Sequence, residues 1–242
     1  MNNLPPITKN LLIINVLCCL GAFAAQRHGV DLNDILGLHF FMASDFKPFQ
    51  LVTYMFMHAD FQHLFFNMFA VWMFGRTLEM VLGPKRFLTY YMVCGIGAGL
   101  VQEVVQYIEF VVMSSSMPTE AVSIVIHEGA GLLKEHLNYA DSSMAALNLA
   151  VGLPCVGASG AVFGILLAFG MLFPNSQMFV FPLPFPIKAK FFVIGYAVIE
   201  LFAGLGSSGD GIAHFAHLGG MIFGFFLILY WRKKKNNGQL YF

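Results

Sequence analysis

The chain has 242 residues, of which 58% are hydrophobic and only 11% are charged. Its mean hydropathy of +0.72 is far above that of a soluble domain and predicts a polytopic membrane protein. The formal net charge is zero, which argues against a nucleic-acid partner because such a partner requires a basic surface. Cys18, Cys19, Cys94 and Cys155 lie in or beside apolar segments without metal spacing, so we expect buried thiols rather than ligands or disulfides.

Six apolar stretches are long enough to cross about 30 Å of hydrocarbon as helices. They occupy residues 11–26, 61–82, 87–108, 153–173, 189–206 and 212–231. Residues 1–242 are therefore expected to form one all-α membrane domain, a six-helix transmembrane bundle. The cationic residues fall on one side of the predicted helices, at Lys9, 85–86, 188–190 and 232–235. The positive-inside rule makes that side cytoplasmic, so both termini are expected inside, in a bacterial inner membrane.

The first stretch, residues 11–26, has a second interpretation. Lys9, the apolar run and Phe23-Ala24-Ala25 resemble a secretory signal with a small-residue cleavage site. Because further spans follow, we favour a retained helix. The sequence alone leaves both interpretations open.

The second stretch, residues 61–82, carries His63 and Asn67 near its outer end. Their i, i+4 spacing places both side chains on one helix face. His58 precedes this stretch, and we expect it near the membrane interface, either holding water or the first loop or simply exposed at the surface. His58 and His63 lack the i, i+4 spacing of a helical zinc pair and have no carboxylate partner, so no metal is expected there.

Residues 109–152 form a long stretch on the outer side. It contains five acidic residues and the single cation Lys134. Residues 121–137 mix apolar and charged side chains as an interfacial helix does, and residues 113–118 indicate a break. The sequence assigns no role to this external loop.

The fourth and sixth stretches open on Gly157-Ala158-Ser159-Gly160 and on Ala216-His217-Leu218-Gly219-Gly220. Ser159 and His217 are each expected about one turn inside a helix, where an ionisable or polar group costs several kcal/mol unless it is used or satisfied. Each lies about 15 residues, or about 22 Å, from the cytoplasmic end of its stretch. The two are therefore level, and His63 with Asn67 brackets the same plane.

Small residues recur at every fourth position beside Ser159 and His217. They are Gly160, Gly164 and Ala168 on one stretch and Ala216, Gly220 and Gly224 on the other. Such stripes let helix backbones approach closely, so the serine and the histidine can form a hydrogen bond. Phe163, one turn beyond Ser159, can pack on the His217 imidazole and hold the ring.

These residues predict nucleophilic catalysis. The sequence offers no evident carboxylate at this depth, so we predict a Ser-His dyad in which His217 is first the general base and then the general acid. Side chains of His63 and Asn67, with the backbone N–H of Ser159, can donate to an oxyanion. His214 is a rival base, and we favour His217 because Gly220 and Gly224 lie on its side of the helix.

From about Pro48 onward the chain resembles the rhomboid intramembrane serine proteases of the bacterial six-helix type. The resembling motifs are residues 48–54, His58 with His63 and Asn67, Gly75, Glu79 and Gly83, Gly-x-Ser-Gly at 157–160, and Ala-His-x-x-Gly at 216–220 with Gly224. The resemblance implies that Ser159 attacks the scissile carbonyl of single-span membrane substrates, with His217 as base and without metal, nucleotide or cofactor. It also implies water entry from outside beneath a loop at 206–212, and residues 189–206 as a lateral gate.

The sequence departs from the family pattern in three places. Many members carry an aromatic-Arg pair where this chain has Phe49-Gln50, a Tyr is common at Phe163, and residues 109–152 are long for the family. These departures concern loop anchoring and ring stacking rather than the reacting groups.

Other functions remain open. A lone Gly-x-Ser-Gly in a membrane helix usually serves packing, and Ala161 stands where the soluble hydrolase elbow needs Gly. One alternative is a catalytically silent rhomboid-like protein that binds membrane-protein clients. Another is a channel or transporter with an outward-facing polar cavity, although the discontinuous helices in paired halves that mark many transporters are missing.

Overall fold

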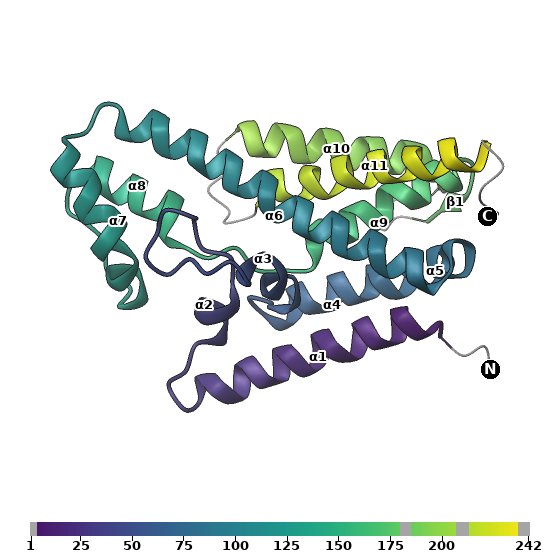
Figure 1. The fold of residues 1–242 in the computed structure, drawn as a ribbon, viewed down its shortest axis with the longest axis horizontal. Helices are drawn as coiled ribbons and strands as arrows, with labels where there is room; N and C mark the ends of the chain where they lie inside the picture. Colours follow the sequence, from purple (N-terminus) through teal and green to yellow (C-terminus); the bar gives the residue numbers. More distant parts are fainter. Residues whose placement is uncertain (1–3, 180–184, 207–212, 237–242) are drawn as a thin grey trace.

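The computed structural model describes residues 4–179, 185–206 and 213–236, without the side chains of the last three. Within these ranges the chain is almost entirely helical (Figure 1). The helices are α1 (Pro6–Gln26), α2 (Leu32–Leu36), α3 (Gln50–Thr53), the 3₁₀ turn η1 (Tyr54–Phe56), α4 (Phe61–Ala70), the π-helical turn η2 (Val71–Gly75), α5 (Arg76–Leu82), α6 (Pro84–Ser114), α7 (Thr119–Lys134), α8 (Ser142–Gly152), α9 (Ser159–Leu172), α10 (Ala189–Leu205) and α11 (His214–Asn236). Two short antiparallel strands, β1 (Gln177–Met178) and β2 (Ile187–Lys188), pair Gln177 with Lys188 and Met178 with Ile187.

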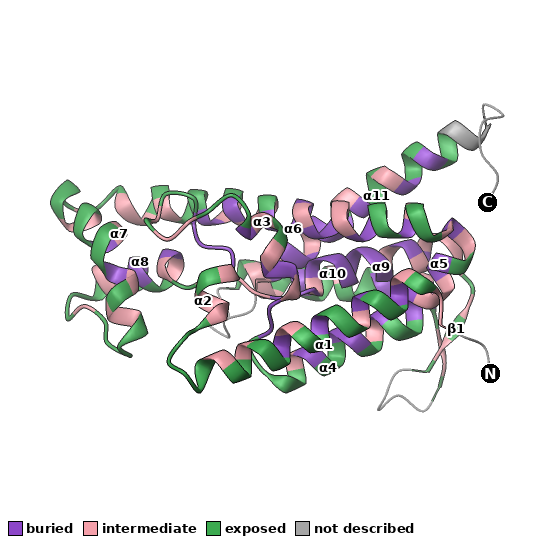
Figure 2. Ribbon diagram, turned by 60° about the horizontal axis from the view of Figure 1, so that its bottom comes forward, coloured by how far each residue is buried: buried purple, intermediate pink, exposed green. Residues whose placement is uncertain are grey.

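Helices α6, α9 and α11 form the centre of the molecule, and α9 is buried along most of its length (Figure 2). Glycines allow the three backbones to touch, because a Cβ at Gly220 would overlap the carbonyl of Gly160 and one at Gly164 would lie 2.7 Å from the Cβ of Cys94. The Tyr90 hydroxyl of α6 donates to the Gly164 carbonyl at 2.8 Å. The small-residue stripes thus lie where the helices meet.

The fourth predicted span was placed too early. It was expected over residues 153–173, but α9 begins at Ser159, so this serine is the first residue of its helix rather than one turn inside. The residues before it do not continue a helix, because Leu38 and Cys155 exchange backbone hydrogen bonds of 2.9 and 2.8 Å and Gly157 has φ of +135°. With 14 residues α9 is about 21 Å long, shorter than the hydrocarbon core.

The predicted external loop contains two helices and part of a third. Helix α6 continues to Ser114, and α7 and α8 follow and pack against each other at the end of the molecule farthest from the start of α1 (Figure 1). The two helices share a small apolar cluster with the first loop, formed by Phe40, Val125, Leu147 and Val151. The loop is therefore folded and packed against the rest of the chain.

Three described helices are long and apolar enough to cross a membrane: α1, α6 and α11 over His214–Lys233. Helix α9 is shorter, and the predicted second span is divided among α4, η2 and α5. The number of six spans therefore stays a prediction. Large apolar side chains are exposed on the outer faces of α4 and α10, among them Phe65, Phe66, Phe191 and Phe202. Because so much exposed apolar surface requires a lipid environment, the chain is an integral membrane protein.

The start of α1, the end of α11 and the turn between α5 and α6 lie at one end of the molecule (Figure 1). Glu79 accepts hydrogen bonds from the backbone N–H groups of Ile7 and Thr8 at 2.9 and 2.7 Å, which ties the start of α1 to α5. At the same end the Arg232 guanidinium donates to the Met171 carbonyl at 2.6 Å. Most cationic residues of the described chain belong to elements at this end, whereas Arg27, Lys47 and Lys134 lie elsewhere.

Candidate active site

Ser159 and His217 meet between α9 and α11. The Ser159 Oγ lies 2.8 Å from the His217 Nε2, and the contact of Gly160 with Gly220 brings the two backbones close enough for this bond. The ring of Phe163 stacks on the imidazole, with centroids 4.2 Å apart and planes 6° from parallel. The contact expected between Phe163 and His217 is therefore present, and it restricts rotation of the imidazole.

A carboxylate stands on the other side of the imidazole. The Glu200 Oε2 of α10 lies 2.9 Å from the His217 Nδ1, and Glu200 is only 7% exposed. The expectation that no carboxylate reaches this depth was wrong. Glu200 follows Ala189, the first residue of α10, by 11 residues or about 17 Å. His217 was placed about 22 Å from the cytoplasmic end of its helix, so the two backbone positions differ in depth by about 5 Å. A glutamate side chain can span this distance.

His214 lies one turn before His217 on α11 and faces the same carboxylate. Its Nδ1 lies 2.7 Å from the Glu200 Oε2. Of the two candidate histidines, His217 is the one whose ring contacts Ser159. The sequence signal for this cluster was an acidic residue inside an otherwise apolar stretch, which is costly to bury without partners.

His63 and Asn67 approach the site from α4. A Cβ at Gly157 would lie 2.8 Å from the His63 Nε2 and 3.5 Å from the Ser159 Oγ, so these atoms border one small space that only glycine leaves open. Asn67 is 5% exposed, and its Nδ2 has no hydrogen-bond partner among the described residues. The backbone N–H of Ser159 lies in the first turn of α9, where N–H groups have no partner within the helix.

Comparison with known proteins shows the family to which this chain belongs. Residues 45–234 match the Rhomboid domain. The chain belongs to the rhomboid family. It is 30% identical over 171 residues to Rhomboid protein 1, mitochondrial, of Saccharomyces cerevisiae, covering 70% of this chain and 38% of that protein. It is 27% identical over 176 residues to Rhomboid protease AarA of Providencia stuartii, covering 70% and 51%.

A third relative is Presenilin-associated rhomboid-like protein A, mitochondrial, of Danio rerio, which is 25% identical over 225 residues, covering 91% of this chain and 47% of that protein. The chain thus spans between about a third and a half of the length of these three relatives. The family assignment confirms the expected fold class, a helical polytopic membrane protein of the rhomboid type. The family includes members named as proteases.

Where many rhomboids carry an arginine after an aromatic residue, this chain has Gln50 after Phe49, and the glutamine forms the hydrogen bonds that hold the first loop. Gln50 is almost fully buried. Its Oε1 accepts from the Lys47 N–H at 3.0 Å, and its Nε2 donates to the carbonyls of Ile35 and Asp45 at 3.2 and 3.0 Å. A neutral amide therefore holds the first loop of this rhomboid through backbone groups. The loop near 206–212, expected to cap the site, lies outside the described residues except for its first.

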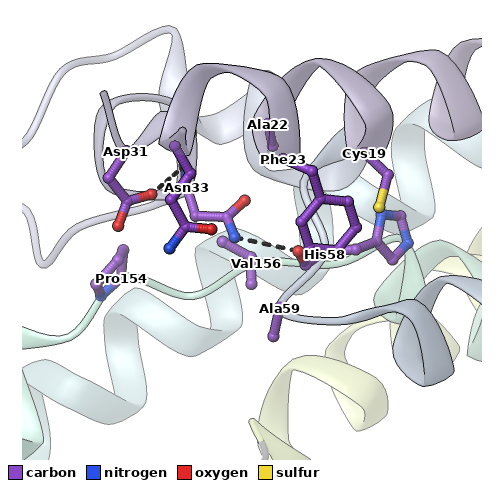
Figure 3. A pocket seen from close by; sticks show the side chains of 10 residues that line it. Cys19, Ala22, Phe23, Asp31, Asn33, His58, Ala59, Pro154 and Val156 are labelled. Atoms are coloured by element: carbon purple, nitrogen blue, oxygen red, sulfur yellow. Dashed lines mark hydrogen bonds between the residues drawn. The ribbon is translucent and has the colours of Figure 1, made fainter. Parts of the chain in front are cut away.

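His58 is buried rather than exposed, which removes the surface interpretation for this residue. It is 2% exposed, and neither ring nitrogen has a hydrogen-bond partner among the described residues. Its ring lies edge-on to that of His63 with centroids 5.1 Å apart. His58 also lines a cavity of about 310 Å³ between α1 and the segment before α9, together with Asp31 and Asn33 (Figure 3). Ser159 and His217 do not line this cavity.

Among the residues that the structure describes, two clusters each bring three potential metal ligands together: Glu200 with His214 and His217, and Asp34 with His39 and Asp45. In the first, the carboxylate oxygen lies 2.7 and 2.9 Å from the two imidazole nitrogens. Two ligands of one tetrahedral zinc ion, each about 2.1 Å from the metal, lie about 3.4 Å apart. The observed separations fit N–H···O hydrogen bonds more closely.

Proposed function

We propose that this rhomboid is an intramembrane serine endopeptidase that hydrolyses peptide bonds of transmembrane substrates near the outer membrane boundary. The main support is the 2.8 Å contact between the Ser159 Oγ and the His217 Nε2 inside an apolar helical bundle. A serine and a histidine on separate helices at this distance are the minimal apparatus for nucleophilic catalysis. Membership of a family with protease members adds to this support.

In the proposed reaction the His217 Nε2 takes the proton of the Ser159 hydroxyl while the Oγ attacks the scissile carbonyl carbon. The oxyanion is stabilised by the Ser159 N–H at the start of α9 and by side-chain donors of His63 and Asn67. The positive end of the α9 dipole adds to this stabilisation. His217 then passes the proton to the leaving amine, and water repeats the sequence on the acyl-enzyme.

The substrate is proposed to be a membrane-spanning segment that unwinds at the cut. A helix in lipid keeps its carbonyls in internal hydrogen bonds, so attack requires local unwinding. The short α9 would hold Ser159 about 9 Å below the outer surface if its other end lies at the inner surface. Substrates with small or helix-breaking residues near the cut should be cleaved faster, and equal rates for strongly helical segments would contradict this proposal.

The cationic end of the molecule is proposed to face the cytoplasm or an equivalent compartment, with both termini there. The start of α6, strand β2 and the last turns of α11 lie at that end (Figure 1), and they carry Lys85 with Arg86, Lys188 and Arg232, respectively. A bacterial inner membrane is our proposed location, although relatives named as mitochondrial place other members of the family in organelles. A single-span substrate and entry beside α10 are part of the same proposal.

A fluorophosphonate probe tests the nucleophile directly. Purified protein should be labelled, whereas Ser159→Ala and His217→Ala should reduce labelling and substrate cleavage by about 10³-fold or more. Ser116→Ala removes an exposed serine outside the bundle and should be labelled like the wild type. An unlabelled wild type would favour the client-binding alternative, and labelling that persists in both site variants would refute the assignment of these residues.

A further inference from the structure

Glu200 is an acidic side chain in the middle of an apolar helix. Its neighbours on α10 include Val198, Ile199 and Leu201, all exposed on the outer surface. Burying a carboxylate in such surroundings is costly unless hydrogen bonds satisfy it. Glu200 has two such partners, and both are imidazoles of α11.

The direction of these hydrogen bonds determines the state of His217. An ionised carboxylate can only accept, so the His217 Nδ1 must carry a hydrogen to bond it. The Nε2 of a neutral ring then keeps its lone pair, and this nitrogen lies 2.8 Å from the Ser159 Oγ. The carboxylate therefore selects the tautomer in which His217 can accept the serine proton.

The same carboxylate would stabilise the charge that develops during the reaction. When His217 takes the serine proton it becomes an imidazolium, and Glu200 is 2.9 Å away in surroundings of low dielectric constant. His214 donates to the same oxygen from one turn away, which fixes the position of the carboxylate. Phe163 covers one face of the ring and His63 borders the site from α4.

We propose that Glu200 is a positioning residue that completes a Ser159–His217–Glu200 triad, with His214 holding the carboxylate in place. This inference rests on the proposed protease function, but it goes beyond a serine and histidine acting alone. If Glu200 served only to join α10 to α11, its hydrogen bond with His214 would be sufficient. The use of both ring nitrogens of His217, one toward Glu200 and the other toward Ser159, is the geometry of a serine-histidine-carboxylate triad.

The kinetic test compares Glu200→Gln with Glu103→Gln. Both glutamates are 7% exposed and lie in apolar helices, but Glu103 accepts from the Phe41 N–H, away from the serine. Glu200→Gln should lower kcat by about 10² to 10⁴-fold with KM within about twofold, and Glu103→Gln should keep the wild-type kcat. Glu200→Asp retains the charge and should lose roughly tenfold to a hundredfold. Equal kcat values for Glu200→Gln and wild type would overturn the inference.

A spectroscopic test does not depend on activity. In protein labelled with ¹⁵N-histidine, His217 should show a protonated Nδ1 and an unprotonated Nε2, and this pattern should be lost in Glu200→Gln. The signal is assigned by its absence in His217→Ala. An unchanged tautomer in Glu200→Gln would refute the positioning role, even if that variant is unstable and inactive.

Two further results separate this inference from its alternatives. If EDTA abolishes activity and Zn²⁺ restores it, the cluster of Glu200, His214 and His217 is a metal site and the triad is overturned. If wild type cleaves and Ser159→Ala does not, while Glu200→Gln is fully active, the proposed protease function stands and only the triad fails.

Discussion

The central bundle of α6, α9 and α11 and the external pair α7 and α8 are both helical, but different interactions hold them. In the bundle the glycines 160, 164 and 220 allow close contact between the helices, and the Tyr90 hydroxyl of α6 donates to the Gly164 carbonyl of α9. In the external pair a small apolar cluster is supplemented by polar groups, such as Asn148 of α8, which donates to the Gly129 carbonyl of α7 at 3.0 Å.

This difference in contacts predicts that substitutions are tolerated less well in the central bundle than in the external pair. Backbone contacts leave no room for an added atom, since packed interiors cannot expand without shifting whole helices. The ion pairs of Lys134 with Asp34 and Asp45, which join the external pair to the first loop, are partly exposed, so each contributes little and water can replace it. The proposed catalytic groups belong to the rigid region, so their separations are set by helix packing rather than by flexible loops.

The largest effect is expected from Gly220→Ala. The added Cβ would overlap the Gly160 carbonyl, which is backbone and cannot move aside. The substitution should lower the free energy of unfolding by about 3 kcal/mol and remove the contact between Ser159 and His217. Thermal unfolding in detergent and probe labelling measure both effects.

The matched control for this substitution is Gly195→Ala in α10. A Cβ there meets no atom within 4 Å, and alanine favours the helix by up to about 1 kcal/mol. Wild-type labelling is expected with unchanged or slightly higher stability. If both glycine variants behave alike, close backbone contact is not what holds the bundle.

Gly157→Ala should affect activity more than folding. Its φ of +135° is rarely adopted by other residues, and a Cβ would fill the space between His63 and Ser159. We expect a loss of roughly a hundredfold in kcat and of about 1–3 kcal/mol in stability. Gly131→Ala in α7, where a Cβ meets no atom within 4 Å, should cleave like the wild type, and equal cleavage by both variants would contradict this role for the Gly157 space.

A smaller effect is expected at Phe163. Its stacking on His217 resembles aromatic pairs that contribute about 0.5–1.5 kcal/mol, which corresponds to roughly twofold to twelvefold in rate. Phe163→Leu should lower kcat by this factor, whereas Phe163→Tyr, which retains the ring, should not. A rate for Phe163→Leu equal to wild type would show that the stacking does not orient the imidazole.

The smallest effect concerns the ion pairs that join α7 to the first loop. The Lys134 Nζ lies 2.9 Å from carboxylate oxygens of both Asp34 and Asp45, and its hydrogen bond holds the pKa of Asp45 below the usual value. This stabilisation is present above the unfolded Asp pKa of about 3.9 and is lost as the pH falls through the lower folded-state value. Because these groups are partly exposed, Lys134→Ala should cost under about 1 kcal/mol.

Hydrogen exchange in α7 measures this contribution as a function of pH and salt. Exchange should be faster in Lys134→Ala at pH 7, and the difference from wild type should shrink in high salt and at low pH. Cleavage should not change. If Lys134→Ala abolished cleavage, the external pair would have to be coupled to the proposed site, and the two regions would not be independent.

The sequence by itself determined the membrane class, the helical fold and the pairing of Ser159 with His217. Composition indicates lipid contact, residue counts along a helix measure depth, and the recurrence of small residues marks where helices approach. Composition, depth and the spacing of small residues are properties of individual helices, so they can be read from the sequence without knowing how the helices pack. The start of α9 was predicted wrongly, because the non-helical residues before Ser159 depend on pairing between Cys155 and Leu38, which is distant in the sequence.

Only the tertiary structure decided which side chains meet around the imidazole. Depth does not determine which way a helix is rotated about its axis, so the approach of Glu200 to His217, and of His214 to the same carboxylate, depends on how α10 packs beside α11. The burial of His58 and the docking of Lys134 likewise require distant segments to come together. Periodicity along one helix carries no information about such lateral contacts.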